Sequence, residues 1–232
     1  MLVFYHKGVN ILIKSLGNAI RKFKVYLWWL YSSKLEDPFI HNLAKEVARI
    51  IGIKPFKNIR VSSRFYIANA AVIGFRCRTL VLTNLLLNIL GAEELKAVLL
   101  HEYAHCKFKH QIKLLVVSFA LMLVIALTAI FITQTIESEL TALSIGIPFL
   151  ILGYLLVVLI TRLITKRFEI EADCLVASKL ENPNLYIELL KKIKNINGEI
   201  RGWRTLLSPH PSTDIRIAYV IKCAEDFSRY RE

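Results

Sequence analysis

The chain has 232 residues, of which 55 % are hydrophobic, and its 31 Lys and Arg residues against 18 Asp and Glu give a formal net charge of +13. This length is enough for one large or two small domains, and the apolar residues gather in long runs, which excludes an ordinary soluble domain. The basic excess suits nucleic acid, an anionic membrane surface or the cytoplasmic flanks of membrane helices, and the position of the charges decides between these partners.

Residues 1–35 form a basic amphipathic segment. Apolar residues recur at helical spacing, four Lys and Arg residues between positions 14 and 24 interrupt any membrane span, and Trp28, Trp29 and Tyr31 follow. The segment lacks the layout of a signal peptide. A helix lying on the membrane interface fits this pattern, and so does an amphipathic helix packed on the protein itself.

Residues 36–111 predict a helix, a small sheet and a second helix, all cytoplasmic. Asp37 followed by Pro38 is typical of a helix start, and Gly52 ends the apolar periodicity of that helix. The next segments are rich in Val, Ile, Phe, Tyr and Thr and are separated by turn residues, which predicts a sheet of about three strands. These segments are residues 60–68, 71–75 and 79–83.

Two long apolar runs, residues 112–133 and 142–164, come next. Each is a little over 20 residues long and carries a single charge close to one end. As helices they would measure roughly 33 Å, enough for a hydrocarbon core of about 30 Å. A buried hairpin in a soluble protein is the alternative, and length and lack of charge count against it. We therefore predict a transmembrane helical hairpin over residues 112–164.

The charges beside these runs predict their orientation. The connecting loop, residues 134–141, carries two glutamates and neither Lys nor Arg, whereas basic residues flank both outer ends of the runs. By the positive-inside rule the loop faces out and both flanks face the cytoplasm. The expected location is the cell membrane, with several passes, and the basic excess then belongs to the lipid bilayer rather than to nucleic acid.

An HExxH motif, HEYAH at residues 101–105, lies in a predicted helix that opens at Gly91 with two glutamates in its first turn. Histidines four apart share one helical face, so both imidazoles can reach one metal ion, and neutral histidine suits zinc. Glu102 can take a proton from water at the open metal position. A helix with two packed histidines is the alternative. The motif predicts His101 and His105 as ligands and Glu102 as the catalytic base.

A third ligand is predicted just after the second apolar run. Glu169 and Asp173 are four apart on one face of a predicted helix, so one can bind the metal while the other supports a ligand histidine; we predict Glu169 as the ligand and Asp173 as the supporting residue. Glu171 points elsewhere on that helix and is expected to be solvated. His105 lies roughly 10 Å before the first span and Glu169 roughly 8 Å after the second, so an antiparallel hairpin would bring both halves of the site together.

Several short motifs stand in a fixed order along the chain: Asn69-Ala70, GAEELKAVLL before HEYAH, the apolar hairpin, RFEIEAD, and finally His210-Pro211 with Arg216. In this order the chain resembles the HtpX and CAAX-prenyl-endopeptidase family of integral membrane zinc metalloproteases. The family's E-x-x-A-D stretch is matched by Glu169, Ala172 and Asp173. The charged N-terminal segment departs from the two initial spans usual in HtpX-type members, and CAAX-type members have more spans still, so the HtpX-like branch is the nearer match.

The resemblance implies endopeptidase activity, one catalytic zinc ion (Zn²⁺) and a catalytic part facing the cytoplasm. It also makes His210 the candidate donor to the oxyanion of the reaction, against a plain loop role between two prolines. Arg216 is expected to pair structurally with an acid. The segment at Asn69 and Ala70 is the candidate substrate-binding edge, to which an extended peptide could add as a further strand.

Together these features predict a mainly α fold with a small β-sheet (α+β): a zincin-like core joined to a transmembrane hairpin, with residues 165–232 as a helical C-terminal part carrying the third ligand. The expected activity is hydrolysis of peptide bonds in membrane or misfolded proteins. The alternative is a membrane-anchored zinc-binding sensor or inactive homologue, and Glu102 argues against it. The sequence does not define an oligomeric state.

The four cysteines are widely spaced and contain no CxxC pair, so buried free thiols are expected rather than a disulfide framework. Cys106 and Cys174 each directly follow a predicted site residue. A sulfur ligand to the metal is therefore a minor alternative, because better-spaced ligands are available.

Overall fold

The computed structural model describes residues 31–63, 66–74, 76–199, 202 and 204–229, so nearly all of the basic segment predicted over residues 1–35 lies outside the described residues. The described part is mainly helical with one small mixed sheet, which confirms the predicted fold class. It divides into two compact units, Met1–Leu43 with Pro55–Leu90 and Ala44–Lys54 with Gly91–Glu232. The four-part division drawn from the sequence stays a prediction.

The helix predicted at Asp37-Pro38 is confirmed as α2, Pro38–Ile51. The Asp37 carboxylate accepts hydrogen bonds from the backbone N–H groups of Phe39 (2.8 Å) and Ile40 (3.4 Å), which are among those left without a partner at a helix start. Gly52 follows the helix with a φ of +79°, a left-handed conformation that favours glycine and ends helices.

The first unit contains a four-stranded sheet in the order β1-β2-β4-β3. The strands are β1 (Ser32–Lys34), β2 (Asn58–Ser62), β3 (Ala70–Ile73) and β4 (Thr79–Thr83). β2 and β4 pair in parallel, and β1 and β3 add at the two edges in antiparallel fashion. Three strands were predicted. The sequence missed β1 because three residues are too few to show a period of two.

A short helix, α3 (Asn84–Ile89), follows β4 directly and was not predicted. Thr83 ends the strand and caps the helix, since its hydroxyl oxygen accepts from the N–H of Leu86. The same hydroxyl accepts from the N–H of Asn69 (3.0 Å), immediately before the edge strand β3. One buried side chain thus fixes the start of β3 and the start of α3.

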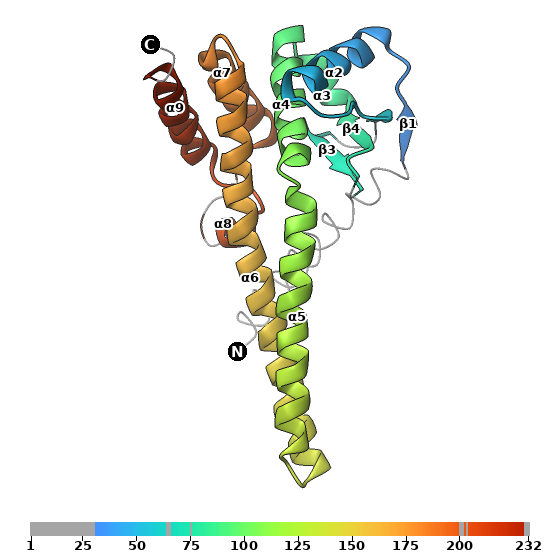
Figure 1. The fold of residues 1–232 in the computed structure, drawn as a ribbon, viewed down its shortest axis with the longest axis vertical. Helices are drawn as coiled ribbons and strands as arrows, with labels where there is room; N and C mark the ends of the chain where they lie inside the picture. Colours follow the sequence, from blue (N-terminus) through green and yellow to red (C-terminus); the bar gives the residue numbers. More distant parts are fainter. Residues whose placement is uncertain (1–30, 64–65, 75, 200–201, 203, 230–232) are drawn as a thin grey trace, which may run out of the picture. The chain divides into compact units, whose positions relative to one another are not determined.

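In the second unit the HExxH helix α4 (Ala92–Lys107) is confirmed, and its start is capped because Glu94 accepts from the N–H of Gly91 at 2.8 Å. Only two residues separate α4 from the next helix, α5 (His110–Gln134). Between them Lys109 has a φ of +56°, a conformation rare outside glycine, which interrupts the helix. The HExxH helix and the first apolar helix are therefore two separate helices, and in Figure 1 they follow one another along nearly the same line.

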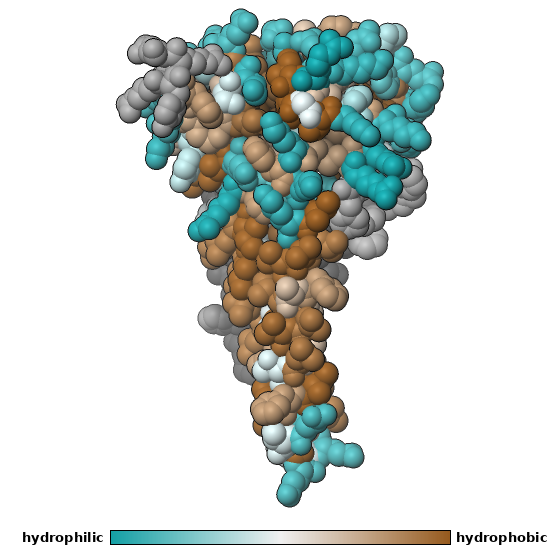
Figure 2. All heavy atoms as spheres, in the orientation of Figure 1, coloured by the Kyte–Doolittle hydropathy of each residue, from teal (hydrophilic) through white to brown (hydrophobic). Residues whose placement is uncertain are grey.

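The second apolar run and the segment bearing Glu169 form one uninterrupted helix, α6 (Glu139–Lys179). Figure 1 shows α5 and α6 side by side along their length and joined at one end. Both are long and apolar enough to cross a membrane, and only 6 % and 11 % of their most apolar windows are buried. This exposure counts against a hairpin buried in a soluble core. Figure 2 shows the brown apolar surface of the hairpin with hydrophilic residues at its tip.

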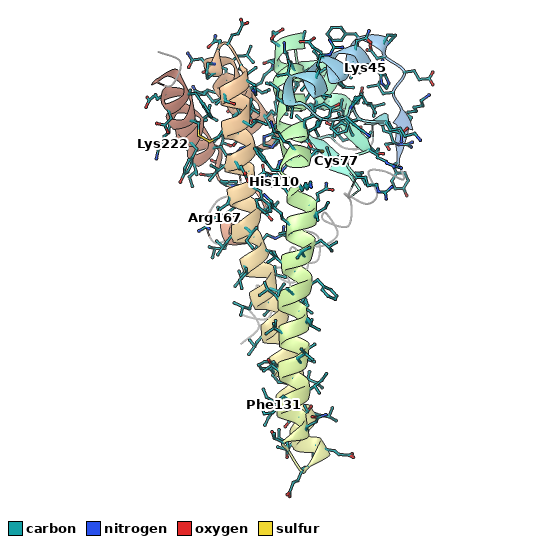
Figure 3. The ribbon with its side chains drawn as sticks, viewed as in Figure 1. Lys45, Cys77, His110, Phe131, Arg167 and Lys222 are labelled. Carbon is teal, nitrogen blue, oxygen red and sulfur yellow. A yellow bond between two sulfur atoms is a disulfide. The ribbon has the colours of Figure 1, made fainter. Side chains whose placement is uncertain are left out.

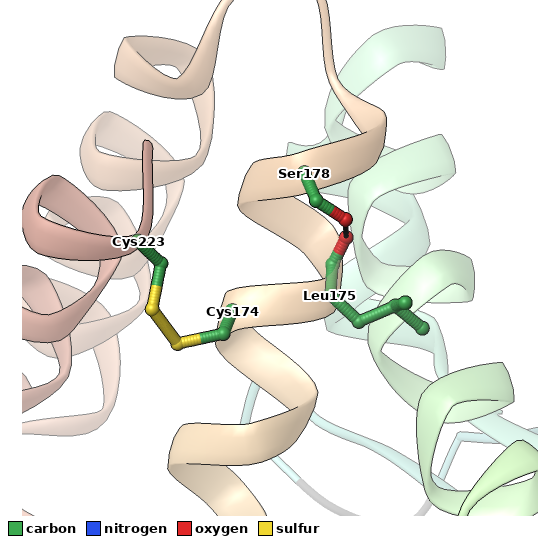
Figure 4. The surroundings of a disulfide bond; sticks show 4 residues. All are labelled: Cys174, Leu175, Ser178 and Cys223. Carbon is green, nitrogen blue, oxygen red and sulfur yellow. Dashed lines mark hydrogen bonds between the residues drawn. A yellow bond between two sulfur atoms is a disulfide. The ribbon is translucent and has the colours of Figure 1, made fainter. Parts of the chain in front are cut away.

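Helices α7 (Pro183–Asn197), α8 (Arg204–Leu207) and α9 (Thr213–Arg229) complete the second unit and pack on α6. A disulfide between Cys174 and Cys223 joins α6 to α9 (Figure 4). None of the four cysteines, all of which lie in the described ranges, is a free thiol. The prediction of free thiols was wrong, because pairing depends on which helices pack together and sequence spacing does not reveal that.

Two glycines on α6 allow α5 to approach closely. A Cβ atom added at Gly153 would lie 2.6 Å from Cγ2 of Ile125, and one added at Gly146 would lie 3.0 Å from Cγ2 of Thr133. Small residues at helix contacts are typical of association between apolar helices, where close van der Waals packing supplies much of the stability.

Gly153→Val should therefore weaken the hairpin, since the branched side chain forces α5 and α6 apart. Overpacking of this kind costs about 1–3 kcal/mol, which would appear as a lower midpoint of thermal unfolding in detergent. Leu152→Val is the matched control, because Leu152 is 66 % exposed. Equal midpoints for the two variants would contradict this packing.

Candidate metal centre

Three side chains from two helices converge in the second unit. Nε2 of His101 and Nε2 of His105 lie 3.1 Å apart on α4. The carboxylate of Glu169, on α6, lies 3.6 Å from His101 Nε2 and 3.4 Å from His105 Nε2 through its two oxygens. One possible ligand atom of each residue lies within 4.8 Å of those of the others. Glu169 is almost fully buried, at 4 % exposure.

These separations fit a tetrahedral zinc ion. Zinc binds histidine nitrogen and carboxylate oxygen at about 2.0–2.2 Å, so two ligand atoms of one tetrahedron lie roughly 3.3–3.5 Å apart. The three measured distances, 3.1, 3.4 and 3.6 Å, bracket this value. Two imidazoles and one carboxylate also form a donor set typical of catalytic zinc, with one coordination position left for water or substrate.

The ring nitrogen of His101 that faces away from this centre is held by buried groups. Its Nδ1 lies 3.0 Å from Oδ1 of Asp173 and 3.1 Å from the hydroxyl of Tyr186. Tyr186 in turn donates to Asp173 at 2.6 Å. A proton on Nδ1 is thereby stabilised, which leaves Nε2 with a free lone pair for a metal.

Arg216 completes this buried network. Its Nε and Nη2 donate to the two oxygens of Asp173, both at 2.7 Å, and Nη2 also lies 3.1 Å from the Tyr186 hydroxyl. The expectation that Arg216 pairs with an acid is confirmed, and the acid is Asp173. This bidentate pairing compensates the charge of a carboxylate that is fully buried.

His105 is supported by a different pair of residues. Its Nδ1 lies 2.8 Å from Nδ1 of His110, the first residue of α5 (labelled in Figure 3). The other ring nitrogen of His110, Nε2, lies 2.9 Å from Oε2 of Glu171. Glu171 was expected to be solvated only. It is 43 % exposed on its side chain but binds His110, because the break at Lys109 turns His110 toward α6.

The charges around the centre favour a cation between the histidines. Burial alone would lower the pKa of His101, but its carboxylate partners Asp173 and Glu169 outweigh burial and raise this pKa to about 10. Burial and the neighbouring positive His101 lower the pKa of His105 to about 3. The two carboxylates thus stabilise a positive charge at this point. A bound metal ion would supply this positive charge while both histidines stay neutral ligands.

The remaining predicted site residues lie in different places. Glu102 follows His101 on α4 and is partly buried. Nδ1 of His210 lies 2.7 Å from Oε2 of Glu169, and the His210 side chain is 54 % exposed, so it reaches the centre from the solvent side. Asn69 and Ala70 belong to the first unit, at the start of the edge strand β3.

Sequence reasoning missed three residues at this centre. The sequence gives no sign that Tyr186 has a role at this centre, because a tyrosine on the apolar face of a helix is common in protein cores. His110 offered one: it is a polar residue two positions before an apolar run and only five residues after His105. Glu171 was assigned to solvent because its partner His110 was not recognised.

A helix that presents two histidines and a glutamate as His101, Glu102 and His105, with a further glutamate supplied by a second helix, is an arrangement typical of zincin-type metallopeptidases. The chain belongs to peptidase family M48, whose family model matches residues 34–223. This confirms the resemblance seen in the sequence at the level of the family, and the HtpX-like branch stays a prediction.

A solved structure shares the fold. The crystal structure of Ste24p from S. mikatae matches with a TM-score of 0.67 and 18 % sequence identity. The match covers 90 % of this chain and 57 % of that chain, so this chain spans a little over half of the length of Ste24p. At this identity the likeness concerns the fold alone. No curated relative matches the chain significantly.

Glu169→Gln should abolish tight metal binding, because it keeps the volume of the side chain but leaves two histidines for a metal that takes three protein ligands. Asp173→Asn should do less, since partners of ligand histidines typically contribute about 10–100-fold in affinity or activity. Zinc content per folded protein, measured after dialysis against a chelator, separates these outcomes.

Glu188→Ala is the control, because Glu188 is an exposed acid on α7 whose ion pair in the described part of the chain is with Lys191 on the same helix. Stoichiometric zinc in Glu169→Gln would show that Glu169 is not a ligand.

Proposed function

We propose that this protein is a membrane-anchored zinc endopeptidase. The observation that carries the proposal is the convergence of His101, His105 and Glu169 at distances suited to one zinc ion, with Glu102 beside the first ligand. Membership of peptidase family M48 supports peptide-bond hydrolysis as the reaction. Proteins and peptides are then the substrates.

The residues of the chain divide the chemistry between them. His101, His105 and Glu169 would hold the metal, which when bound supplies Lewis-acid chemistry and makes water acidic enough to ionise near neutral pH. Glu102 accepts the proton of the attacking water and then passes it to the leaving amine. Asp173, Tyr186 and Arg216 keep His101 in the tautomer that presents Nε2 to the metal.

His210 is the candidate donor to the oxyanion of the tetrahedral intermediate. Its contact with Glu169 and its half-exposed side chain support this role, because a donor must reach the reacting carbonyl from the side where substrate arrives. Asn69 and Ala70 are the candidate substrate-binding residues. The edge position of β3, which pairs on one side only with β4, supports strand addition by an extended peptide.

An alternative is a zinc-binding sensor without turnover, built on the same three ligands. Glu102 favours the enzyme, because a site that only binds zinc needs no carboxylate next to the ligand histidine. The HtpX-like resemblance points to membrane or misfolded proteins as the substrate class.

Glu102→Gln should abolish proteolysis and keep the metal, because the carboxylate acts on water and is not a ligand. The purified protein in detergent would be assayed for cleavage of a denatured protein such as casein, and its zinc content measured in parallel. Cleavage at the wild-type rate by this variant would overturn the assigned base. Zinc bound by a wild-type protein that cleaves nothing would favour the sensor.

We further propose that α5 and α6 cross the membrane, with the metal centre on the cytoplasmic side. Their length and exposed apolar surface support the crossing. The acidic tip and the basic residues at the other end of the hairpin support the orientation. The disulfides favour the opposite side, because such bonds persist mainly in oxidising compartments, with intracellular proteins of hyperthermophiles as the exception.

Cysteine labelling decides the orientation. A cysteine replacing Glu137, at the hairpin tip, should react with a membrane-impermeant maleimide on intact cells, whereas a cysteine replacing Glu188 should react only after permeabilisation. The protein without an added cysteine is the control for labelling of its four native cysteines. The reverse pattern would place the metal centre outside, and labelling of both positions on intact cells would refute the crossing.

A further inference from the structure

We propose that His110 and Glu171 act as a positioning pair for the second ligand histidine, His105. The inference rests on the proposed zinc centre. It concerns His110, which lies outside the HExxH motif, and Glu171, which occupies an unspecified position of the E-x-x-A-D stretch. Three side chains form a line: His105 Nδ1 to His110 Nδ1 at 2.8 Å, then His110 Nε2 to Glu171 Oε2 at 2.9 Å. In this arrangement the pair orients the ring of His105, as Asp173 orients the ring of His101.

The contact depends on the break between α4 and α5. In an uninterrupted helix, residues five apart point about 140° away from each other around the axis, so His110 would face away from His105. The left-handed conformation of Lys109 ends one helix and starts the next, which returns His110 to the face of the ligand. A rare backbone conformation outside glycine therefore serves this one contact.

Hydrogen bonding fixes the tautomers along the line. A histidine that binds metal through Nε2 carries its proton on Nδ1, so His105 donates to His110. His110 must then accept through Nδ1 and carry its own proton on Nε2, which it donates to the Glu171 carboxylate. Each atom has one role, and no alternative assignment satisfies both bonds with His105 as a neutral Nε2 ligand.

Packing holds His110 in this orientation. The residue is 3 % exposed, and its ring stacks on that of Phe168, with centroids 4.2 Å apart and planes 3° from parallel. Phe168 directly precedes Glu169 on α6. A histidine that served only to fill the core would leave polar nitrogens buried at a cost, whereas both nitrogens here are paired.

The two ligand histidines are thus supported unequally. Asp173 is fully buried and also bound by Arg216 and Tyr186, whereas the Glu171 side chain is 43 % exposed. Solvent weakens the bond of an exposed carboxylate. We expect loss of Glu171 to cost less metal affinity than loss of the His110 acceptor.

The test is the zinc affinity of the full-length protein in detergent, measured by competition with a chelator. His110→Phe keeps the ring stacked on Phe168 but removes the acceptor, and should weaken binding about 10–100-fold. His110→Asn should recover much of this loss, because its Oδ1 stands where imidazole Nδ1 stood. Glu171→Ala should weaken binding by less than tenfold, and Glu188→Ala, the matched exposed acid, should not.

A double variant tests whether Glu171 acts through His110. The asparagine side chain of His110→Asn does not extend to the position of imidazole Nε2, so Glu171→Ala should have no added effect in that background. An undiminished loss there would show that Glu171 acts by its charge alone and would overturn the pair. Cobalt-substituted protein supplies a second readout, since the visible spectrum should change in His110→Phe and not in Glu188→Ala.

Zinc binding by His110→Phe within twofold of wild type would also overturn the proposal. Should His110→Phe fail to fold without metal, as judged by its thermal unfolding, the His110→Asn and Glu171→Ala variants decide the question. A wild-type protein that binds no zinc would refute the proposed function itself, which separates that failure from failure of the positioning pair.

Discussion

One buried carboxylate, that of Asp173, joins the helices of the metal centre. It lies on α6 and binds His101 from α4, Tyr186 from α7 and Arg216 from α9. Because the carboxylate is fully buried, loss of its cationic partner would leave an uncompensated charge, which costs about 3–5 kcal/mol. The packing of four helices and the orientation of the His101 ring therefore depend on the same group.

Helix α6 connects this buried network to the proposed membrane region. Its apolar run and the segment with Glu169 and Asp173 are one continuous helix, so the position of Glu169 is tied to that of the apolar run. The close approach of α5 at Gly153 and the disulfide from Cys174 to α9 hold the same helix at two points along its length. A rigid helix anchored in this way is a suitable carrier for a ligand that must be placed to within a fraction of an ångström.

The two histidines of the candidate metal centre differ in the residues that support them. His101 is supported by a closed network of buried groups, while His105 is supported through His110 and an exposed glutamate. His210 approaches Glu169 from the solvent side. The candidate metal centre is therefore enclosed by buried groups on the Asp173 side and more exposed on the His210 side. In the proposed function, the exposed side leaves room for a polypeptide substrate.

The local sequence pattern was enough to predict α2, the HExxH helix, three of the strands and both apolar helices. Helix caps, hydrophobic periodicity and element length all depend on residues that are neighbours in the sequence. The spacing of HEYAH and of Glu169 with Asp173 also named the residues that converge, since residues four apart share a helical face. The roles of Tyr186, His110 and Glu171 and the pairing of Cys174 with Cys223 arise only in the tertiary structure. Each depends on contacts between helices distant in sequence, or on the left-handed conformation of Lys109, which the local sequence pattern does not predict.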